Sequence, residues 1–165
     1  DVYKRQPQFL SHPYHLYIWK LTEWLGRGIP GLGFAYNSYG AYASVNHLHF
    51  QMFVRDTPLP LTSARWRHNG GALDYPTDCE VYDSVARAWR RLDDLHRSNT
   101  SYNLLYLPGR LFCLPRKTQG DYKHGPWTQG FAWHELAGGI TTFSRADYET
   151  LDAPAIRAEL AKLRL

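Results

Sequence analysis

The chain has 165 residues, of which 44 % are hydrophobic and 15 % aromatic, and it carries a formal net charge of +4. This length supports one domain with a sizeable core, and this composition excludes a disordered chain. The basic residues are spread along the chain, which permits anionic ligands and argues against an arm that binds nucleic acid.

The first third of the chain predicts one helix and one strand. Apolar residues recur at helical spacing between Pro13 and Gly26, which predicts a helix there. The segment 28–33, GIPGLG, predicts a loop, and 34–44, FAYNSYGAYAS, is typical of a strand tip or a tight loop. The segment 45–54, VNHLHFQMFV, then predicts a strand.

The rest of the chain predicts helices and strands in mixed order. The clearest signal is an apolar stripe at helical spacing that begins near Ser84, a residue able to cap a helix. The predicted elements are a helix at 83–99, a hairpin at 102–117 around Pro108 and Gly109, a strand at 131–143, a short turn capped by Ser144, and a helix at 154–165.

Helices and strands alternate, yet the hairpin requires antiparallel pairing, and this combination favours an α+β fold over a doubly wound parallel sheet. A helix followed by strands occurs twice in the sequence. We therefore expect a single domain over 1–165 with two half-repeats, one at 8–60 that contains the segment HLHFQ and a second one at 80–165.

Two features of the sequence narrow the class of protein. No apolar run reaches the roughly 18 residues of a transmembrane helix, so we expect no membrane contact. Cys79 and Cys113 stand alone, which predicts neither a zinc framework nor a disulfide scaffold. A reducing, cytoplasmic location is the resulting expectation.

The predicted strand at 45–54 places three polar residues on one face. Side chains alternate between the faces of a strand, so His47, His49 and Gln51 should lie on the same side. The opposite face should direct three apolar residues into a core, and these are Leu48, Phe50 and Met52.

Three interpretations of this polar face compete. It can be the solvated side of a half-exposed strand, although His and Gln are unusual choices for that role. It can be a zinc site, but zinc prefers three good protein ligands and Gln51 is a poor third one. It can also hold a histidine nucleophile, with one ring nitrogen attacking while the other donates its proton to a fixed acceptor.

The segment NSYGAYASVNHLHFQ resembles the active-site segment of the histidine-triad (HIT) superfamily, and it is most similar to the branch of GDP-hexose phosphorylases. The likeness rests on His-x-His-x-Gln and on a preceding Asn-Ser-x-Gly-Ala loop with a small hydroxyl residue. Two further segments, 101–117 and 135–149, are similar to the same branch. The matching loop residues are Asn37, Ser38, Gly40, Ala41 and Ser44.

The resemblance implies a role for each motif residue. His49 would be the nucleophile, the backbone carbonyl of His47 would hold its ring, and Gln51 would contact non-bridging phosphate oxygens. Ser44 would approach the same phosphate. The remaining loop residues, Asn37, Ser38 and Gly40, would shape the nucleotide-phosphate pocket.

Outside the motif, the sequence offers weaker candidates. Arg116 follows a predicted strand and can reach a substrate phosphate or simply be a solvated strand end. His134 and Glu135 suggest acid–base chemistry, but neighbours on a strand face opposite sides, so at most one would enter a site.

The function implied by the resemblance is nucleotidyl transfer. A GDP-hexose would give a covalent nucleotidyl-histidine and a hexose 1-phosphate, and inorganic phosphate would then release a nucleoside diphosphate. Neither a cofactor nor a metal is expected, and a homodimer is compatible with the family. The alternatives are a dinucleoside polyphosphate phosphorylase or hydrolase and a non-catalytic nucleotide-binding domain.

The implied fold is a HIT-like antiparallel sheet with flanking helices, here as the C-terminal part of a two-repeat protein. The resemblance therefore also predicts that an N-terminal region, which helps to bind base and substrate in the family, is missing from this sequence.

Overall fold

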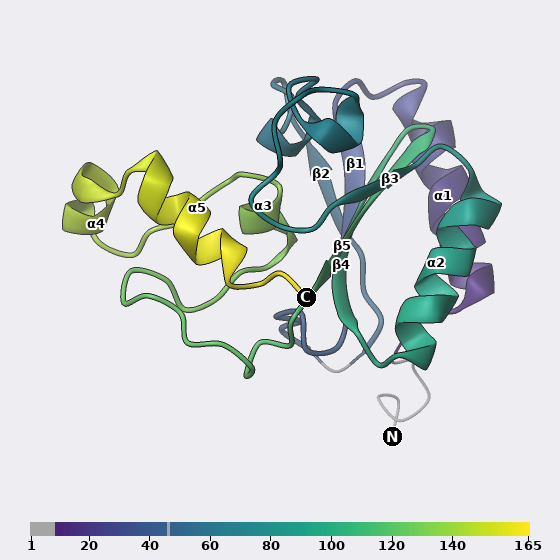
Figure 1. Ribbon diagram of the computed structural model, residues 1–165. Coiled ribbons are helices and arrows are strands. Elements are labelled where there is room, and N and C mark those ends of the chain that lie inside the picture. The colour runs from purple at the N-terminus through teal and green to yellow at the C-terminus, as the bar shows by residue number, and fades with distance from the viewer. Residues whose placement is uncertain (1–8, 46) are drawn as a thin grey trace.

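A computed structural model describes residues 9–45 and 47–165, and its centre is an antiparallel sheet of five strands (Figure 1). The strand order is β2-β1-β4-β5-β3. This arrangement confirms the predicted α+β class and its antiparallel pairing. The strands are β1 (Leu32–Asn37), β2 (Gln51–Val54), β3 (Glu80–Tyr82), β4 (Ser101–Leu107) and β5 (Arg110–Arg116).

Helices cover both faces of the sheet and enclose two apolar cores. Two long helices lie together on one face, whereas α3 and α5 lie on the other, as Figure 1 shows. None of these helices, within the described ranges, combines the length and apolarity needed to cross a membrane. The helices are α1 (His12–Gly26), α2 (Val85–Arg97), α3 (Trp133–Leu136), α4 (Arg145–Thr150) and α5 (Ala153–Ala161), with 3₁₀ turns at η2 (Pro60–Thr62) and η3 (Arg67–Asn69).

The strongest sequence signals are confirmed. Helix α2 begins after Ser84, whose side chain accepts a hydrogen bond from the backbone of Arg87, and it buries Leu92 and Leu95. Strands β4 and β5 pair from end to end around a two-residue turn, in which Gly109 has a φ of 72°. A glycine suits this turn because other residues rarely adopt a positive φ.

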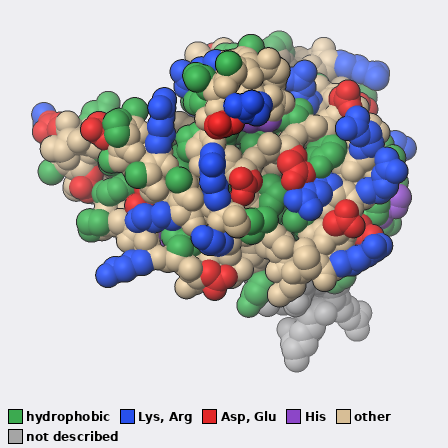
Figure 2. Space-filling model, viewed as in Figure 1, with side chains coloured by type: hydrophobic (Ala, Val, Ile, Leu, Met, Phe, Trp, Pro, Cys, Tyr) green, Lys and Arg blue, Asp and Glu red, His purple; other side chains and the backbone are tan. Residues whose placement is uncertain are grey.

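The surface has no single sign of charge on the face drawn in Figure 2, where Lys and Arg alternate with Asp and Glu. Several charged side chains of the protein pair locally, such as Arg67 with Asp74 and Arg145 with Glu149. Exposed pairs of this kind stabilise a fold only slightly. The net positive charge therefore forms no basic stripe on this face.

Two predicted elements differ in the structure, and one strand was not predicted. The segment 131–143 is not a strand, because α3 forms at Trp133–Leu136, where Glu135 accepts a hydrogen bond from the backbone of Ala132 at 3.0 Å. The predicted loop or strand tip at 34–44 begins inside β1, a fully buried strand. The sequence also gave no signal for β3, a three-residue strand at the sheet edge.

The predicted strand at 45–54 is shorter in the structure. Pairing with β1 covers only Gln51 to Val54, opposite Ala35 to Leu32. Asn46 of this segment, and Gln8 at the start of the predicted 8–60 half, lie outside the described residues. The division into two half-repeats, 8–60 and 80–165, stays a prediction.

A buried histidine joins α1, α2 and β4. His15 Nε2 lies 3.1 Å from the carbonyl oxygen of Val85, which can only accept, so this nitrogen carries the proton. The other ring nitrogen, Nδ1, lies 2.9 Å from the hydroxyl of Tyr106 and accepts from it. Burial lowers the pKa of His15 to about 4, so its ring is neutral at pH 7.

The neutral state of His15 makes the stability of the fold depend on pH. An unfolded histidine takes up a proton near its ordinary pKa of 6.5, whereas the folded one resists protonation down to about 4. The free energy of unfolding should therefore fall as the pH is lowered through this range, by up to about 3 kcal/mol. Urea unfolding at several pH values measures this loss, and the non-titrating His15→Gln variant should lack most of the slope. Equal slopes for both proteins would contradict the assignment.

Candidate active site

The motif residues lie between β1 and β2. The chain leaves β1 in a tight turn, in which the backbone N–H of Ala41 donates to the carbonyl oxygen of Ser38 at 3.0 Å. Gly40 has a φ of 75°, and a Cβ there would lie 2.4 Å from Ser101 Oγ. Both the backbone conformation and the close approach therefore require glycine.

The ring of His49 is oriented by its own chain. Its Nδ1 lies 3.1 Å from the carbonyl oxygen of His47, and the two rings are 5.9 Å apart between centroids. A carbonyl oxygen only accepts hydrogen bonds, so Nδ1 must carry the proton. When the ring is neutral, the second nitrogen, Nε2, then keeps its lone pair, which is the form that can attack an electrophile.

The separation of polar and apolar side chains holds only in part, because His47 and His49 precede the paired strand. Leu48 and Phe50 still pack against the core under α1 and α2. Met52 does not enter that core, and its side chain is 59 % exposed because β2 is the edge strand of the sheet. The prediction that a strand would place His47 and His49 is therefore wrong, because both lie in irregular backbone before β2.

Gln51 lies on the face of the sheet that α3 covers, which is opposite to the core that Leu48 and Phe50 enter. Its neighbour there is Trp133, a residue that the sequence did not indicate. The indole N–H of Trp133 donates to Gln51 Oε1, and the indole ring stacks on Phe53 with 4.9 Å between centroids. Trp133 lies in the four-residue helix α3. The apolar run at 131–143 predicted a strand, so this helix was not expected. Glu135 at the third helical position was the one local signal for this helix start.

Asn37 is a buried junction behind the motif loop. Its Oδ1 accepts hydrogen bonds from Asn103 Nδ2 at 2.7 Å and from the backbone N–H of Trp133 at 3.0 Å. The same Asn103 nitrogen also donates to the carbonyl oxygen of Ala41. The amide oxygen of Asn37 thus holds the site together, and the predicted contact of Asn37 with a nucleotide stays a prediction.

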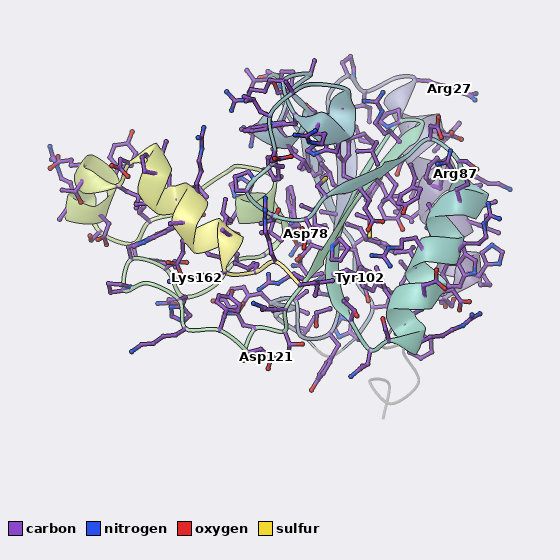
Figure 3. The ribbon with its side chains drawn as sticks, in the orientation of Figure 1. Arg27, Asp78, Arg87, Tyr102, Asp121 and Lys162 are labelled. Carbon is purple, nitrogen blue, oxygen red and sulfur yellow. The ribbon has the colours of Figure 1, made fainter. Side chains whose placement is uncertain are left out.

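The other loop residues divide between packing and solvent. Ser38 is buried, and its Oγ accepts from the backbone N–H of Tyr102, labelled in Figure 3, at 2.8 Å. Ser44 is exposed and lines a cavity of about 400 Å³ together with Gly40 and Gln119. Ser44 therefore faces space that a phosphate could enter, whereas the hydroxyl of Ser38 already binds the backbone of Tyr102.

Arg116 is more deeply buried than its position at a strand end suggested. Its side chain is 1 % exposed and donates to the backbone of Lys117 and Phe131 and to the side chains of Gln119 and Tyr122. Burial lowers the pKa of this guanidinium. Contact with a substrate phosphate stays a prediction, but the observed bonds favour a role in holding the loop at 117–131.

The remaining chemistry around the site is sparse. Within residues 9–45 and 47–165, no three His, Cys, Asp or Glu side chains gather as a metal site requires. The carboxylate of Glu135 accepts one hydrogen bond from the backbone N–H of Ala132, at the start of α3. It accepts a second one from the hydroxyl of Thr141 at 2.8 Å. Arg55 and Pro58, at the other end of β2, help to line a cavity of about 520 Å³, which is larger than the one lined by Ser44. Neither His49 nor Gln51 lines this cavity.

Comparison with known proteins identifies the fold. No protein-family model matches the chain, and no curated protein is detectably similar in sequence. Crystal structures of yeast Ap4A phosphorylase Apa2 are similar in structure, in complex with AMP (TM-score 0.66, 16 % identity), without ligand (0.68, 15 %) and with Ap4A (0.67, 16 %).

The predicted antiparallel sheet with flanking helices is thereby confirmed as a fold that these structures share. The alignments cover 94–95 % of this chain and 63–65 % of the yeast enzyme, so the chain spans less than two thirds of that protein. At 15–16 % identity, the likeness shows a shared fold. Activity has to be argued from the side chains of this chain.

The junction at Asn37 can be tested through stability. Replacing Asn37 by Ala removes the acceptor of two buried donors, which should lower the free energy of unfolding by about 2–4 kcal/mol. Urea unfolding measures the change, and Ser44→Ala, an exposed change in the same loop, should cost less than about 0.5 kcal/mol. Similar losses for the two variants would show that Asn37 is not a structural junction.

Proposed function

We propose that this chain transfers nucleotidyl groups through a covalent intermediate on His49. The single observation that carries the proposal is the contact of His49 Nδ1 with the carbonyl oxygen of His47. In a neutral ring this contact would place the proton on Nδ1 and leave the lone pair on Nε2, and it would hold the ring in one orientation; an attacking imidazole requires both.

The reaction has two balanced steps. In the first, Nε2 of His49 attacks the α-phosphorus of a nucleotide, and the bond from that phosphorus to its bridging oxygen breaks. The leaving group departs as a phosphate ester or polyphosphate, which is already a weak base and needs little protonation. In the second, an oxygen of inorganic phosphate attacks the same phosphorus, the P–N bond breaks, and a nucleoside diphosphate leaves.

Gln51 suits this chemistry because an amide can donate hydrogen bonds but cannot protonate a leaving group. Its N–H groups would stabilise the charge on the equatorial oxygens of the transferred phosphoryl group, an interaction that strengthens in the transition state. Ser44 would add a hydroxyl from the cavity that it lines with Gly40 and Gln119. In the family that the motif resembles, glutamine at the position of Gln51 goes with transferases and phosphorylases, whereas a third histidine goes with hydrolases.

The proposed substrate is a GDP-hexose, with inorganic phosphate as second substrate. The support is the likeness of the Asn-Ser-x-Gly-Ala loop and His-x-His-x-Gln to the GDP-hexose phosphorylases. A second candidate is a dinucleoside polyphosphate, because the similar yeast structures are those of an Ap4A phosphorylase, one of them with Ap4A bound. A non-catalytic nucleotide-binding domain is the alternative outside enzymes.

The covalent step is tested by labelling. GDP-glucose or diadenosine tetraphosphate with a radiolabelled α-phosphate is incubated with the protein, which is then denatured and separated from free nucleotide. The wild type should retain label, and His49→Ala and His49→Asn should lose it by at least about 100-fold. His47→Ala is the matched control, and it should keep most of the labelling because the acceptor for His49 is a backbone carbonyl.

Each outcome of the labelling experiment has a distinct meaning. Label from GDP-glucose that inorganic phosphate releases as GDP supports the proposed substrate. Label from diadenosine tetraphosphate alone would reject the GDP-hexose and favour the second candidate. Absence of label with both compounds would reject the covalent mechanism and favour a non-catalytic domain.

A further inference from the structure

Trp133 makes three contacts that converge on β1 and β2. Its backbone N–H donates to Asn37 at the end of β1, its ring stacks on Phe53 of β2 at an interplanar angle of 19°, and its indole N–H donates to Gln51. The indole itself is 9 % exposed, so it has little freedom to rotate. Helix α3 therefore presents one N–H, in one direction, to the side chain of Gln51.

The chemistry of the two groups decides how the amide of Gln51 is oriented. An indole N–H is only a donor, so the atom of Gln51 that faces it must be the amide oxygen. The NH₂ group, on the other side of the amide carbon, is then directed away from α3. Rotating the amide by half a turn would set NH₂ against N–H, with neither hydrogen bond made.

We propose that Trp133 is a positioning residue that holds the amide of Gln51 with its NH₂ group directed toward the transferred phosphate. This inference rests on the proposed function, in which Gln51 contacts non-bridging oxygens. With Oε1 facing the indole, the side of the amide that is directed away from α3 offers N–H donors to a ligand. It therefore binds anionic oxygens and turns no lone pair toward them.

The proposal also gives α3 a function in substrate choice. A ligand that presents hydrogen-bond donors at this position meets the NH₂ of Gln51 and has no acceptor there. A phosphoryl group presents only acceptors in its ionised form, so the fixed amide selects for it. Without the indole, both orientations of the amide become accessible, and one of them would repel the phosphate oxygens.

One arm of the test needs no substrate. In a ¹H–¹⁵N NMR spectrum of the full chain, the indole N–H of Trp133, assigned from the Trp133→Phe variant, should show the downfield shift and slow exchange of a hydrogen-bonded group. Gln51→Ala should move this signal upfield and speed its exchange at least about ten-fold. If the signal of Trp133 is the same in Gln51→Ala, the indole does not hold Gln51 and the proposal is overturned.

The second arm measures the effect on chemistry as a double-mutant cycle. Trp133→Phe keeps an aromatic ring beside Phe53, removes the N–H donor and makes the side chain smaller, a loss of volume that the control variant below shares. It should slow the covalent labelling of His49 by about ten-fold, and the same change in a Gln51→Ala background should slow it no further. Equal slowing in both backgrounds would mean that Trp133 acts independently of Gln51, and no slowing in either would also overturn the proposal.

The matched control is Trp127→Phe. Trp127 lies on the same side of the sheet and packs against Phe131, with 5.8 Å between ring centroids. The same loss of an indole N–H should leave the labelling rate unchanged there. If neither GDP-glucose nor diadenosine tetraphosphate labels the wild type, the proposed function fails, while the NMR arm still decides whether Trp133 holds Gln51.

Discussion

One amide oxygen, Oδ1 of Asn37, connects the three parts of the chain on which the site depends. It accepts from Asn103 of β4 and from the backbone of Trp133 in α3, residues that are 66 and 96 positions away in the sequence. Both donors are buried, so a missing acceptor would cost more than an average hydrogen bond contributes. This junction fixes where β1 ends, and the motif loop starts at that point.

The loop can then be irregular and still place its side chains. None of the described residues between Ser38 and Phe50 takes part in strand pairing, yet each end of this segment is fixed by β1 and β2. Between them, Leu48 and Phe50 enter the core under α1 and α2. The histidine pair needs only a local contact, because His49 takes its acceptor two residues back along its own chain.

Gln51 differs from the histidines in being set by distant contacts. It begins β2 opposite Ala35, and its amide oxygen faces the indole of Trp133, 82 residues further along. Under the proposed function, the attacking ring is oriented locally and the phosphate-binding amide is oriented by a separate helix, so the two can vary independently. In this arrangement, changes in the segment that carries α3 would alter ligand choice while leaving the attacking ring as it is.

The features that sequence reasoning predicted are those with local causes. The apolar stripe of α2, the Pro108-Gly109 turn and the contact between His47 and His49 each arise within a few residues. The features it missed depend on partners far away. The four-residue helix α3 is stabilised by contacts to β1 and β2, and the pattern of apolar residues in the sequence does not indicate such contacts.

Burial at two other positions also followed from the fold rather than from the residue type. Met52 is exposed because its strand is at the sheet edge, a fact that only the strand order reveals. Arg116 is buried because the loop at 117–131 folds back over it and supplies its acceptors. Neither the apolar pattern around Met52 nor the basic pair at the end of β5 contains this information.

The central claim is that the carbonyl oxygen of His47 keeps the proton of His49 on Nδ1 and leaves Nε2 free to attack. Nitrogen-15 NMR of the imidazole of His49, at a pH where the ring is neutral, measures this directly. The account predicts a protonated Nδ1 and an unprotonated Nε2 with a pyridine-like shift. A neutral ring with its proton on Nε2 would contradict it, because that nitrogen could then not act as the nucleophile.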